Sequence, residues 1–130
     1  PLNIIDRRLE VSGWLSKLNK NGIEVHTRST FLQGLLLMSR TKIPSKFNQW
    51  SKIWDSWAQE LEKNNLDAAS VCLSYPLSLP EVSRVIIGVD NLDQFKSLIL
   101  ASNSNLKKKD WSFMKSFNLK LINPSNWKFL

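Results

Sequence analysis

The amino-acid sequence predicts an α/β fold, in which strands and helices alternate along the chain. The segment 1–29 follows the order strand, helix, strand, and its loops are as short as those of a βαβ unit. The segment 83–89 contains three successive β-branched residues, which favour a strand buried on both faces of a parallel sheet. A helical pattern begins directly after this strand. The class therefore follows from the pattern of elements alone.

The N-terminal unit consists of a strand over 1–6, a helix over 7–22 and a second strand over 23–29. The helix is indicated by apolar side chains at helical spacing, namely Leu9, Trp14, Leu15 and Leu18. Asn21-Gly22 is a typical helix C-terminus. We expect a loop over 37–49, because this stretch contains Pro44 and scattered polar residues.

Two helices are expected in the middle of the chain. The segment 47–64 carries apolar residues on one stripe, which indicates core packing and not a ligand site: Trp50, Ile53, Trp54, Trp57 and Leu61. The segment 65–80 predicts a second helix that begins near Asn65 or Asp67 and is ended by Pro76 and Pro80.

The strand over 83–89 ends at Gly88, and a helix over 90–102 follows with Asn91 as its N-cap. Phe95, Leu98 and Ile99 are expected on the inner face of that helix.

The tail is expected to hold a short helix around 107–117 and then an irregular end. We assign residues 1–105 to the α/β region and 106–130 to a C-terminal helix and tail of the same domain.

The charge of the chain is concentrated at its C-terminal end. The whole sequence carries a net charge of +7, of which +2 falls in residues 1–105 and +5 in residues 106–130. Aromatic side chains do not alternate regularly with the basic ones, so a solvated tail is favoured over a nucleic-acid groove. A basic nucleic-acid-binding module that uses Lys107, Lys108 and Lys109 is the rival hypothesis, and it predicts binding that falls steeply with salt.

Other function classes receive little support from the sequence. No apolar run approaches the roughly 18 residues that a membrane span needs, and no leader pattern is visible, so we expect no membrane contact. The single Cys72 fits a reducing, cytoplasmic setting. His26 is the only histidine and is interpreted as structural, which makes a metal site improbable. No Ser-His-Asp constellation or close carboxylate pair is evident.

Two places could carry chemistry. The turn from Gly88-Val89 into the next helix would present free backbone N–H groups that suit an anion such as a nucleotide phosphate. Arg28-Ser29 lies at the carboxyl end of its strand, which is where parallel α/β folds bind ligands. An arginine there can meet a phosphate or lie on a ring, and an ion pair within the protein is an equally good interpretation.

Four segments, taken in order, resemble one family. They are "PLNIIDRR", "GIEVHTRSTFLQGLLL", "AASVCLSYPLSLPEVSRVIIGVDNLDQF" and "LINPSNWK". Together they resemble the C-terminal part of the aldo/keto reductase family, especially its bacterial subgroup with an Arg-Ser-x-Phe-Leu-Gln-Gly stretch. The resemblance runs from Pro1 to about Trp127. Since the chain also begins with proline inside an expected strand, it is interpreted as a piece of a longer protein.

The resemblance implies the last three βα units of a (β/α)8 TIM barrel, with 1–6 as the sixth strand, 23–29 as the seventh and 83–88 as the eighth. Members of the family bind NADP, less often NAD, across the carboxyl rim of the barrel and reduce carbonyl compounds. By position, the resemblance implies cofactor contacts from Arg28, Ser29, Phe31, Leu32, Gly34, Gly88, Val89, Asn91 and Gln94.

This sequence departs from the family at several of these positions. Arg28 stands where an aromatic residue commonly stacks on the nicotinamide, and Ser97 and Leu98 replace a Glu-Asn pair that contacts the adenine. No cation stands at Gly88 or Gln94, so NAD and NADP both remain possible.

Nothing in this chain matches the family's catalytic Asp, Tyr, Lys and His, and His26 is not that histidine. We therefore expect a cofactor-binding part of a reductase that is inactive alone. The small-molecule carbonyl substrate is sugar-like by this hypothesis. The alternative is a non-catalytic nucleotide-binding scaffold or regulatory protein on the same fold. Three barrel strands would leave open edges and an apolar inner face, which predicts aggregation or loose packing.

Overall fold

The two strands β1 (His26–Thr27) and β2 (Arg84–Val85) pair in parallel, with His26 opposite Arg84. Their carboxyl ends therefore lie at the same edge of the small sheet. In this computed structural model the described residues are 1–104, 106 and 110–130. The predicted parallel pairing is confirmed, although both strands are much shorter than the expected 23–29 and 83–89.

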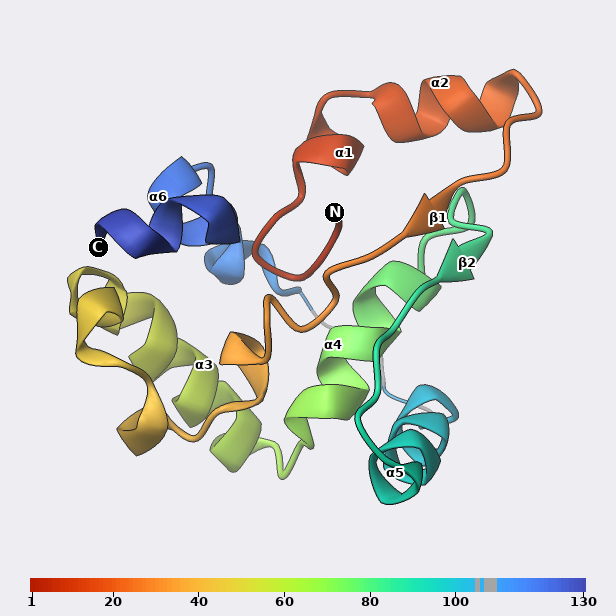
Figure 1. Cartoon of the computed structure of the whole chain (residues 1–130). Coiled ribbons are helices and arrows are strands. Elements are labelled where there is room, and N and C mark those ends of the chain that lie inside the picture. Colours follow the sequence, from red (N-terminus) through yellow and green to blue (C-terminus); the bar gives the residue numbers. More distant parts are fainter. Residues whose placement is uncertain (105, 107–109) are drawn as a thin grey trace.

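Helices dominate the rest of the molecule, which is a mixed, helix-rich α/β structure with a small parallel sheet. The α-helices in the described part are α1 (Arg8–Val11), α2 (Trp14–Lys20), α3 (Ser51–Lys63), α4 (Ala68–Leu77), α5 (Leu92–Ser102) and α6 (Leu119–Ile122). Short 3-10 turns cover Leu35–Leu37, Arg40–Lys42, Ser45–Trp50, Ser112–Met114 and Pro124–Phe129. In Figure 1, α4 lies at the centre, with α3 and α5 on either side of it.

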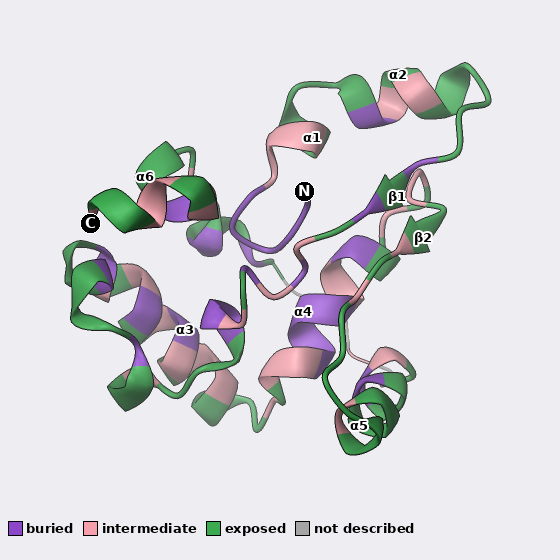
Figure 2. Ribbon diagram, in the orientation of Figure 1, coloured by how far each residue is buried: buried purple, intermediate pink, exposed green. Residues whose placement is uncertain are grey.

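The expected strand over 1–6 is wrong. The side-chain oxygen of Asn3 accepts hydrogen bonds from the backbone N–H groups of Ile5 and Asp6, at 3.0 and 2.8 Å, and this bends the chain. Only the start of the segment follows β1, because the N–H of Leu2 donates to the carbonyl oxygen of Arg28 at 3.0 Å. The segment is nevertheless buried, as the purple N-terminal coil in Figure 2 shows.

Several helix boundaries also differ from the prediction. The helix expected over 7–22 is divided into α1 and α2 at Gly13, whose φ of 77° does not fit a right-handed helix. The expected loop over 37–49 contains 3-10 turns, and α3 begins at Ser51.

Helix α4 begins directly after Asp67, which is one of the two residues predicted to start it. Asp67 caps the helix by accepting from the N–H of Ser70. Pro76 lies inside the helix, which runs on to Leu77. Ser78 N–H still donates to the Ser74 carbonyl, so Pro76 itself does not end the helix as predicted.

The segment after β2 is not buried on both faces, which corrects the prediction. Ile86 is 52% exposed and Val89 is 42% exposed. Within the described ranges β2 pairs with β1 alone, so its other edge has no neighbouring strand. Asn91 is confirmed as the N-cap of α5, but only Leu98 of the expected inner face is buried, since Phe95 and Ile99 are exposed.

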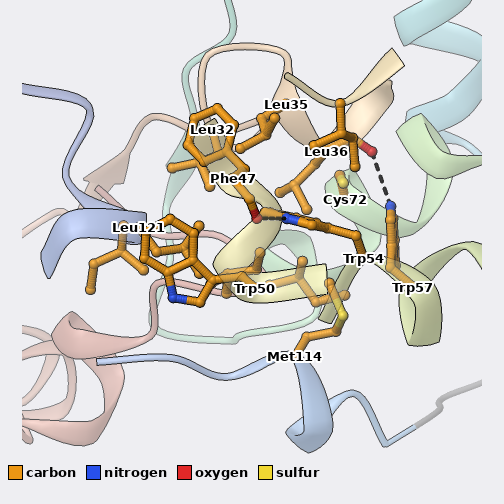
Figure 3. Close-up of a cluster of buried hydrophobic side chains, with 14 of the residues drawn as sticks. Leu32, Leu35, Leu36, Phe47, Trp50, Trp54, Trp57, Cys72, Met114 and Leu121 are labelled. Carbon is orange, nitrogen blue, oxygen red and sulfur yellow. Dashed lines mark hydrogen bonds between the residues drawn. The ribbon is translucent and has the colours of Figure 1, made fainter. Parts of the chain in front are cut away.

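The main hydrophobic core gathers around the Trp-rich helix α3, as predicted (Figure 3). Trp54 donates its indole N–H to the carbonyl oxygen of Phe47 at 3.1 Å, and Trp57 donates to that of Leu36 at 3.1 Å. Both hydrogen bonds satisfy buried polar groups that would otherwise be costly. Cys72 of α4 lies in the same core.

The tail closes over this core. Met114, Leu121 and Ile122 are buried, and Trp127 donates its indole N–H to the Leu121 carbonyl at 2.9 Å. The helix expected around 107–117 falls partly on residues outside the described ranges, and of the described ones Ser112–Met114 form a 3-10 turn. The three lysines of the nucleic-acid hypothesis, 107–109, also lie outside the described residues.

Candidate functional site at the carboxyl edge of the sheet

Strand β1 ends in Arg28 and Ser29, and the N-terminal coil holds this end in place. Leu2 N–H donates to the Arg28 carbonyl, and the side-chain amide of Asn3 donates to the Ser29 carbonyl at 3.0 Å. The backbone of the pair is therefore fixed from the N-terminal side. The Arg28 side chain remains exposed, and its Nη1 donates to the Ser29 hydroxyl at 3.2 Å.

The loop after β1 has an unusual backbone. Ser29, Leu32, Gln33 and Gly34 have φ values of 67°, 48°, 55° and 79°, all in the left-handed region that non-glycine residues rarely adopt. Three of these residues are consecutive, so the chain forms one left-handed turn before the 3-10 turn at Leu35–Leu37. Such strain persists only where the surroundings hold it, and it is concentrated at functional sites in many proteins.

The turn leaves backbone donors available. Leu32 N–H donates to the Ser29 carbonyl at 3.1 Å. Within the described part of the chain, the N–H groups of Phe31, Gln33 and Gly34 donate to no atom. Gln33 is exposed and Gly34 is half-buried, so both residues lie at the surface of the loop. Neighbouring free N–H groups of this kind form sites that suit an anion.

Leu32 and Phe31 anchor the loop and differ in exposure. Leu32 is 1% exposed and belongs to the main core, so only its backbone could contact a bound molecule. Phe31 is half-buried and packs against both hydrophobic clusters, the main core and the smaller one around Leu98. The loop is thus fastened to the interior at two successive side chains.

The second part of the site is the connection from β2 to α5. Gly88, Val89 and Asn91 are exposed. The side-chain oxygen of Asn91 accepts from Gln94 N–H at 2.8 Å, and that of Gln94 accepts from Asp90 N–H at 2.6 Å. Asn91 and Gln94 therefore shape the loop and the start of α5, where the positive end of the helix dipole lies.

Parallel pairing brings the two parts together. Ile86 N–H donates to the Thr27 carbonyl at 2.7 Å. Directly after this bond, one segment continues into Arg28 and the other continues into the loop at Gly88. Arg28 makes no ion pair with a described carboxylate, whereas Asp90 and Asp93 lie beside the start of α5. The edge is therefore positive on the β1 side and partly neutralised on the α5 side.

Sequence reasoning missed two residues of this region. The hydroxyl oxygens of Thr27 and Thr30 are buried and have no hydrogen-bond partner in the described structure. Thr27 lies in β1 and Thr30 in the strained loop. Buried polar atoms are nearly always paired, so these two are exceptions. A strand pattern shows which face a threonine occupies but not whether its hydroxyl finds an acceptor.

His26 is the first residue of β1, so it lies at the amino-terminal end of the strand, away from the carboxyl edge. Its Nε2 lies 3.1 Å from a carboxylate oxygen of Glu24, and Arg84 lies 3.3 Å from the same oxygen. The hydrogen bond from His26, followed by the charges of His26 and Arg84, lowers the pKa of Glu24. This arrangement is an exposed ion-pair cluster across the two strands.

Cys72 is fully buried, and burial, with a smaller effect from Asp67, raises the pKa of its thiol. A raised pKa keeps the sulfur protonated and unreactive at neutral pH. Among the described residues, no three His, Cys, Asp or Glu side chains are grouped to hold a metal ion. None of the described helices is both long and apolar enough to cross a membrane.

Two parallel strands joined through helices, with a cationic side chain and free backbone donors at their carboxyl ends, define an α/β protein with a candidate anion site at that edge. The chain belongs to the aldo/keto reductase family: the family's model matches residues 1–119 of the 130. This membership confirms the resemblance and supports an oxidoreductase-like function. A search among curated proteins found no match.

Proposed function

We propose that this chain is the cofactor-binding, C-terminal part of an NAD(P)-dependent reductase of carbonyl compounds. The observation that carries the proposal is the parallel pairing of β1 and β2, which brings Arg28-Ser29 and the Gly88–Asn91 connection to one edge. By this proposal the two strands are the seventh and eighth of a (β/α)8 barrel. The bound nicotinamide would supply hydride to the carbonyl carbon.

The residues at the edge fit a dinucleotide in three respects. The exposed guanidinium of Arg28 can pair with a pyrophosphate, since arginine binds phosphate oxygens in a bidentate manner. The backbone N–H groups of Gln33 and Gly34 offer further donors to an anion. The unpaired hydroxyl of Thr30 belongs to the same loop and has capacity for one more hydrogen bond.

The two nucleotides differ in charge, and the site offers little to distinguish them. Gly88 and Gln94 carry no positive charge, and Asp90 and Asp93 would repel a 2′-phosphate. Arg28 is the exposed cation at the other side of the edge. NAD and NADP therefore both remain in the proposal, and a parallel titration with the two separates them.

The test is a titration of the 130-residue chain with NADPH and, separately, with NADH. Binding is measured by the fluorescence of the bound nucleotide. We expect saturable binding of at least one. Arg28→Gln should weaken it about 10-fold, as expected when a charge-assisted contact of about 1.4 kcal/mol is lost. Arg84→Gln is the matched control, because Arg84 is an exposed arginine at the other end of the same sheet.

Two outcomes would contradict the proposal. Absence of binding of both nucleotides would mean that the edge is not a cofactor site in this chain. Equal affinities of the Arg28→Gln and Arg84→Gln proteins would mean that Arg28 has no part in it.

A nucleotide-binding scaffold without turnover remains the second candidate, and both candidates predict binding. They differ in the preceding part of the coding sequence, which for a reductase must supply the Asp, Tyr, Lys and His of the family. A reductase also predicts carbonyl-dependent oxidation of the nucleotide when that part is present. We place the protein in the cytoplasm by the same proposal, since Cys72 is a free thiol.

A further inference from the structure

Asn3 is a buried polar residue of the N-terminal coil, with 0% of its surface exposed. Its side-chain oxygen accepts from the N–H groups of Ile5 and Asp6, and its side-chain nitrogen donates to the carbonyl oxygen of Ser29 at 3.0 Å. A buried amide is costly unless it is hydrogen-bonded, and here both ends of the amide have partners. The orientation of this side chain is therefore fixed by three hydrogen bonds.

The two ends of the Asn3 amide connect different parts of the chain. The oxygen bonds to N–H groups only two and three residues further on, which produces the bend of the coil. The nitrogen bonds across 26 positions of sequence to the residue after Arg28. An ionised aspartate could accept the two local hydrogen bonds but could not donate the distant one. The amide nitrogen is therefore the part of Asn3 that connects the coil to the carboxyl edge.

Ser29 receives this bond, and its backbone is strained, with a φ of 67°. Its carbonyl oxygen accepts from Asn3 Nδ2 and also from Leu32 N–H, at 3.0 and 3.1 Å. Two donors use both lone pairs of a carbonyl oxygen. The peptide group after Ser29 is thus held from the coil and from the loop at once, as a strained conformation requires.

The orientation of Ser29 determines where the Arg28 guanidinium lies. Arg28 Nη1 donates to the Ser29 hydroxyl at 3.2 Å, and Arg28 makes no ion pair with a described carboxylate. The direction of this hydroxyl depends on the backbone conformation of Ser29. An exposed arginine loses side-chain freedom when it binds an anion, and a hydrogen bond that already directs the arginine reduces this cost.

A second contact between the coil and this edge is less specific. Leu2 N–H donates to the Arg28 carbonyl at 3.0 Å. This is a backbone bond, which any residue except proline could make at position 2. Of these two contacts, the one from Asn3 alone depends on the identity of a side chain.

We propose that Asn3 is a positioning residue of the candidate cofactor site. Its amide holds Ser29 in the left-handed conformation and, through the Ser29 hydroxyl, directs the Arg28 guanidinium toward an anion at the carboxyl edge. The inference rests on the proposed function for its ligand, the pyrophosphate of a nicotinamide nucleotide. The contact with Ser29 belongs to the chain itself, so it can be measured without any ligand.

The first test therefore uses the chain alone. Asn3→Ser keeps an oxygen that can accept within the bend, as serine does in such turns, but it removes the amide nitrogen. We expect Leu32 N–H, which shares the Ser29 carbonyl with Asn3, to exchange with solvent at least about 10-fold faster. Asn3→Asp is the second variant: it keeps both acceptor bonds of the bend and should give the same faster exchange at pH 7.

Asn126→Ser is the matched control. The side-chain amide of Asn126 also donates to a backbone carbonyl, that of Leu119 at 3.0 Å, but in the tail. This variant should change neither Leu32 exchange nor nucleotide binding. Unchanged Leu32 exchange in both Asn3 variants would overturn the proposal.

The second test measures the affinity for NADPH and for NADH in two backgrounds. Asn3→Ser should weaken binding about 5-fold, because the arginine must then be ordered at the moment of binding. In the Arg28→Gln background it should weaken binding no further, since its effect passes through Arg28. A residue with a merely structural role would weaken binding by the same factor in both backgrounds, and that result would overturn the proposal.

Failure of the proposed function gives a different result. If the unchanged chain bound neither nucleotide, the cofactor site and the positioning role at that site would both be wrong. The exchange of Leu32 N–H would then still show whether Asn3 holds Ser29.

Discussion

Trp57 of α3 donates its indole N–H to the carbonyl oxygen of Leu36 at 3.1 Å, across 21 positions of sequence. This bond connects the Trp-rich helix to the backbone that follows the left-handed turn. Trp57 is 2% exposed and also packs edge-on against Trp111, with ring centres 5.5 Å apart. One side chain thus joins the strained loop, α3 and the tail.

Trp57→Phe is expected to destabilise the chain by about 1–3 kcal/mol, because the buried Leu36 carbonyl would lose its partner while most of the ring remains. The measurement is the free energy of unfolding in urea. Trp14→Phe is the control: Trp14 is 53% exposed on α2, so its change should stay within about 0.5 kcal/mol. Similar losses for the two variants would show that the indole hydrogen bond contributes nothing specific.

A second prediction concerns the turn itself. Gly34→Ala should cost about 1 kcal/mol, because the φ of 79° is unfavourable for any residue with a Cβ. Gly88→Ala should cost less, since Gly88 does not have a positive φ. A Cβ added at either glycine meets no atom within 4 Å, so the comparison measures the cost of the backbone conformation without steric clashes. Equal urea midpoints of the two variants would contradict it.

The start of α5 gives a third prediction. Asn91→Ala should destabilise the protein by about 0.5–2 kcal/mol, whereas Asn91→Gly should cost only a few tenths, because glycine adopts the N-cap backbone readily. Unfolding of the two variants in urea, with hydrogen exchange at Gln94 N–H, measures the difference. If Gln94 N–H exchanged equally fast in Asn91→Ala and in the unchanged protein, the cap would not be formed in solution.

The sequence was sufficient for features that depend on local pattern. The apolar stripe of α3, the cap residue Asn91 and the parallel order of β1 and β2 all follow from spacing or residue type, and the structure has them. The family followed from four segments, and the family model, which matches residues 1–119, covers the first three of them.

Features that depend on specific side-chain contacts could not be predicted. Nothing in the composition of "PLNIID" distinguishes a strand from a coil, and the bend is produced by the Asn3 side chain accepting two backbone protons. The burial of the segment after β2 was overestimated because burial of a strand depends on its neighbours, and in the described residues β2 pairs with β1 alone.

A cavity that is lined by residues of α1, α4 and α5 was likewise invisible in the sequence. Its serines look like ordinary helix-surface residues, and only the structure shows that Ser74, Ser78, Ser102 and Ser104 share one wall. Hydroxyls that bond to the preceding turn are common in helices. Their grouping beside Glu10 depends on how three helices pack.

The last prediction concerns alkaline pH. Burial raises the pKa of the Cys72 thiol, so the folded state keeps its proton where the unfolded chain, with an ordinary pKa of about 8.5, loses it. This stability is fully present below about pH 8.5 and is lost as the pH rises toward the folded pKa. Between roughly pH 9 and 10 the free energy of unfolding should therefore fall by about 1.4 kcal/mol per pH unit.

Cys72→Ala removes this group and should leave a flatter profile over the same range, whatever its own stability at pH 7. Burial and its hydrogen bond to Glu10 also raise the pKa of the Tyr75 phenol, but Tyr75 is present in both proteins and therefore contributes equally to both slopes. Urea unfolding of both proteins at half-unit steps from pH 7.5 to 10 gives the two slopes. Parallel slopes would mean that the Cys72 thiolate is accommodated in the folded chain, and the buried position of this sulfur would then be wrong.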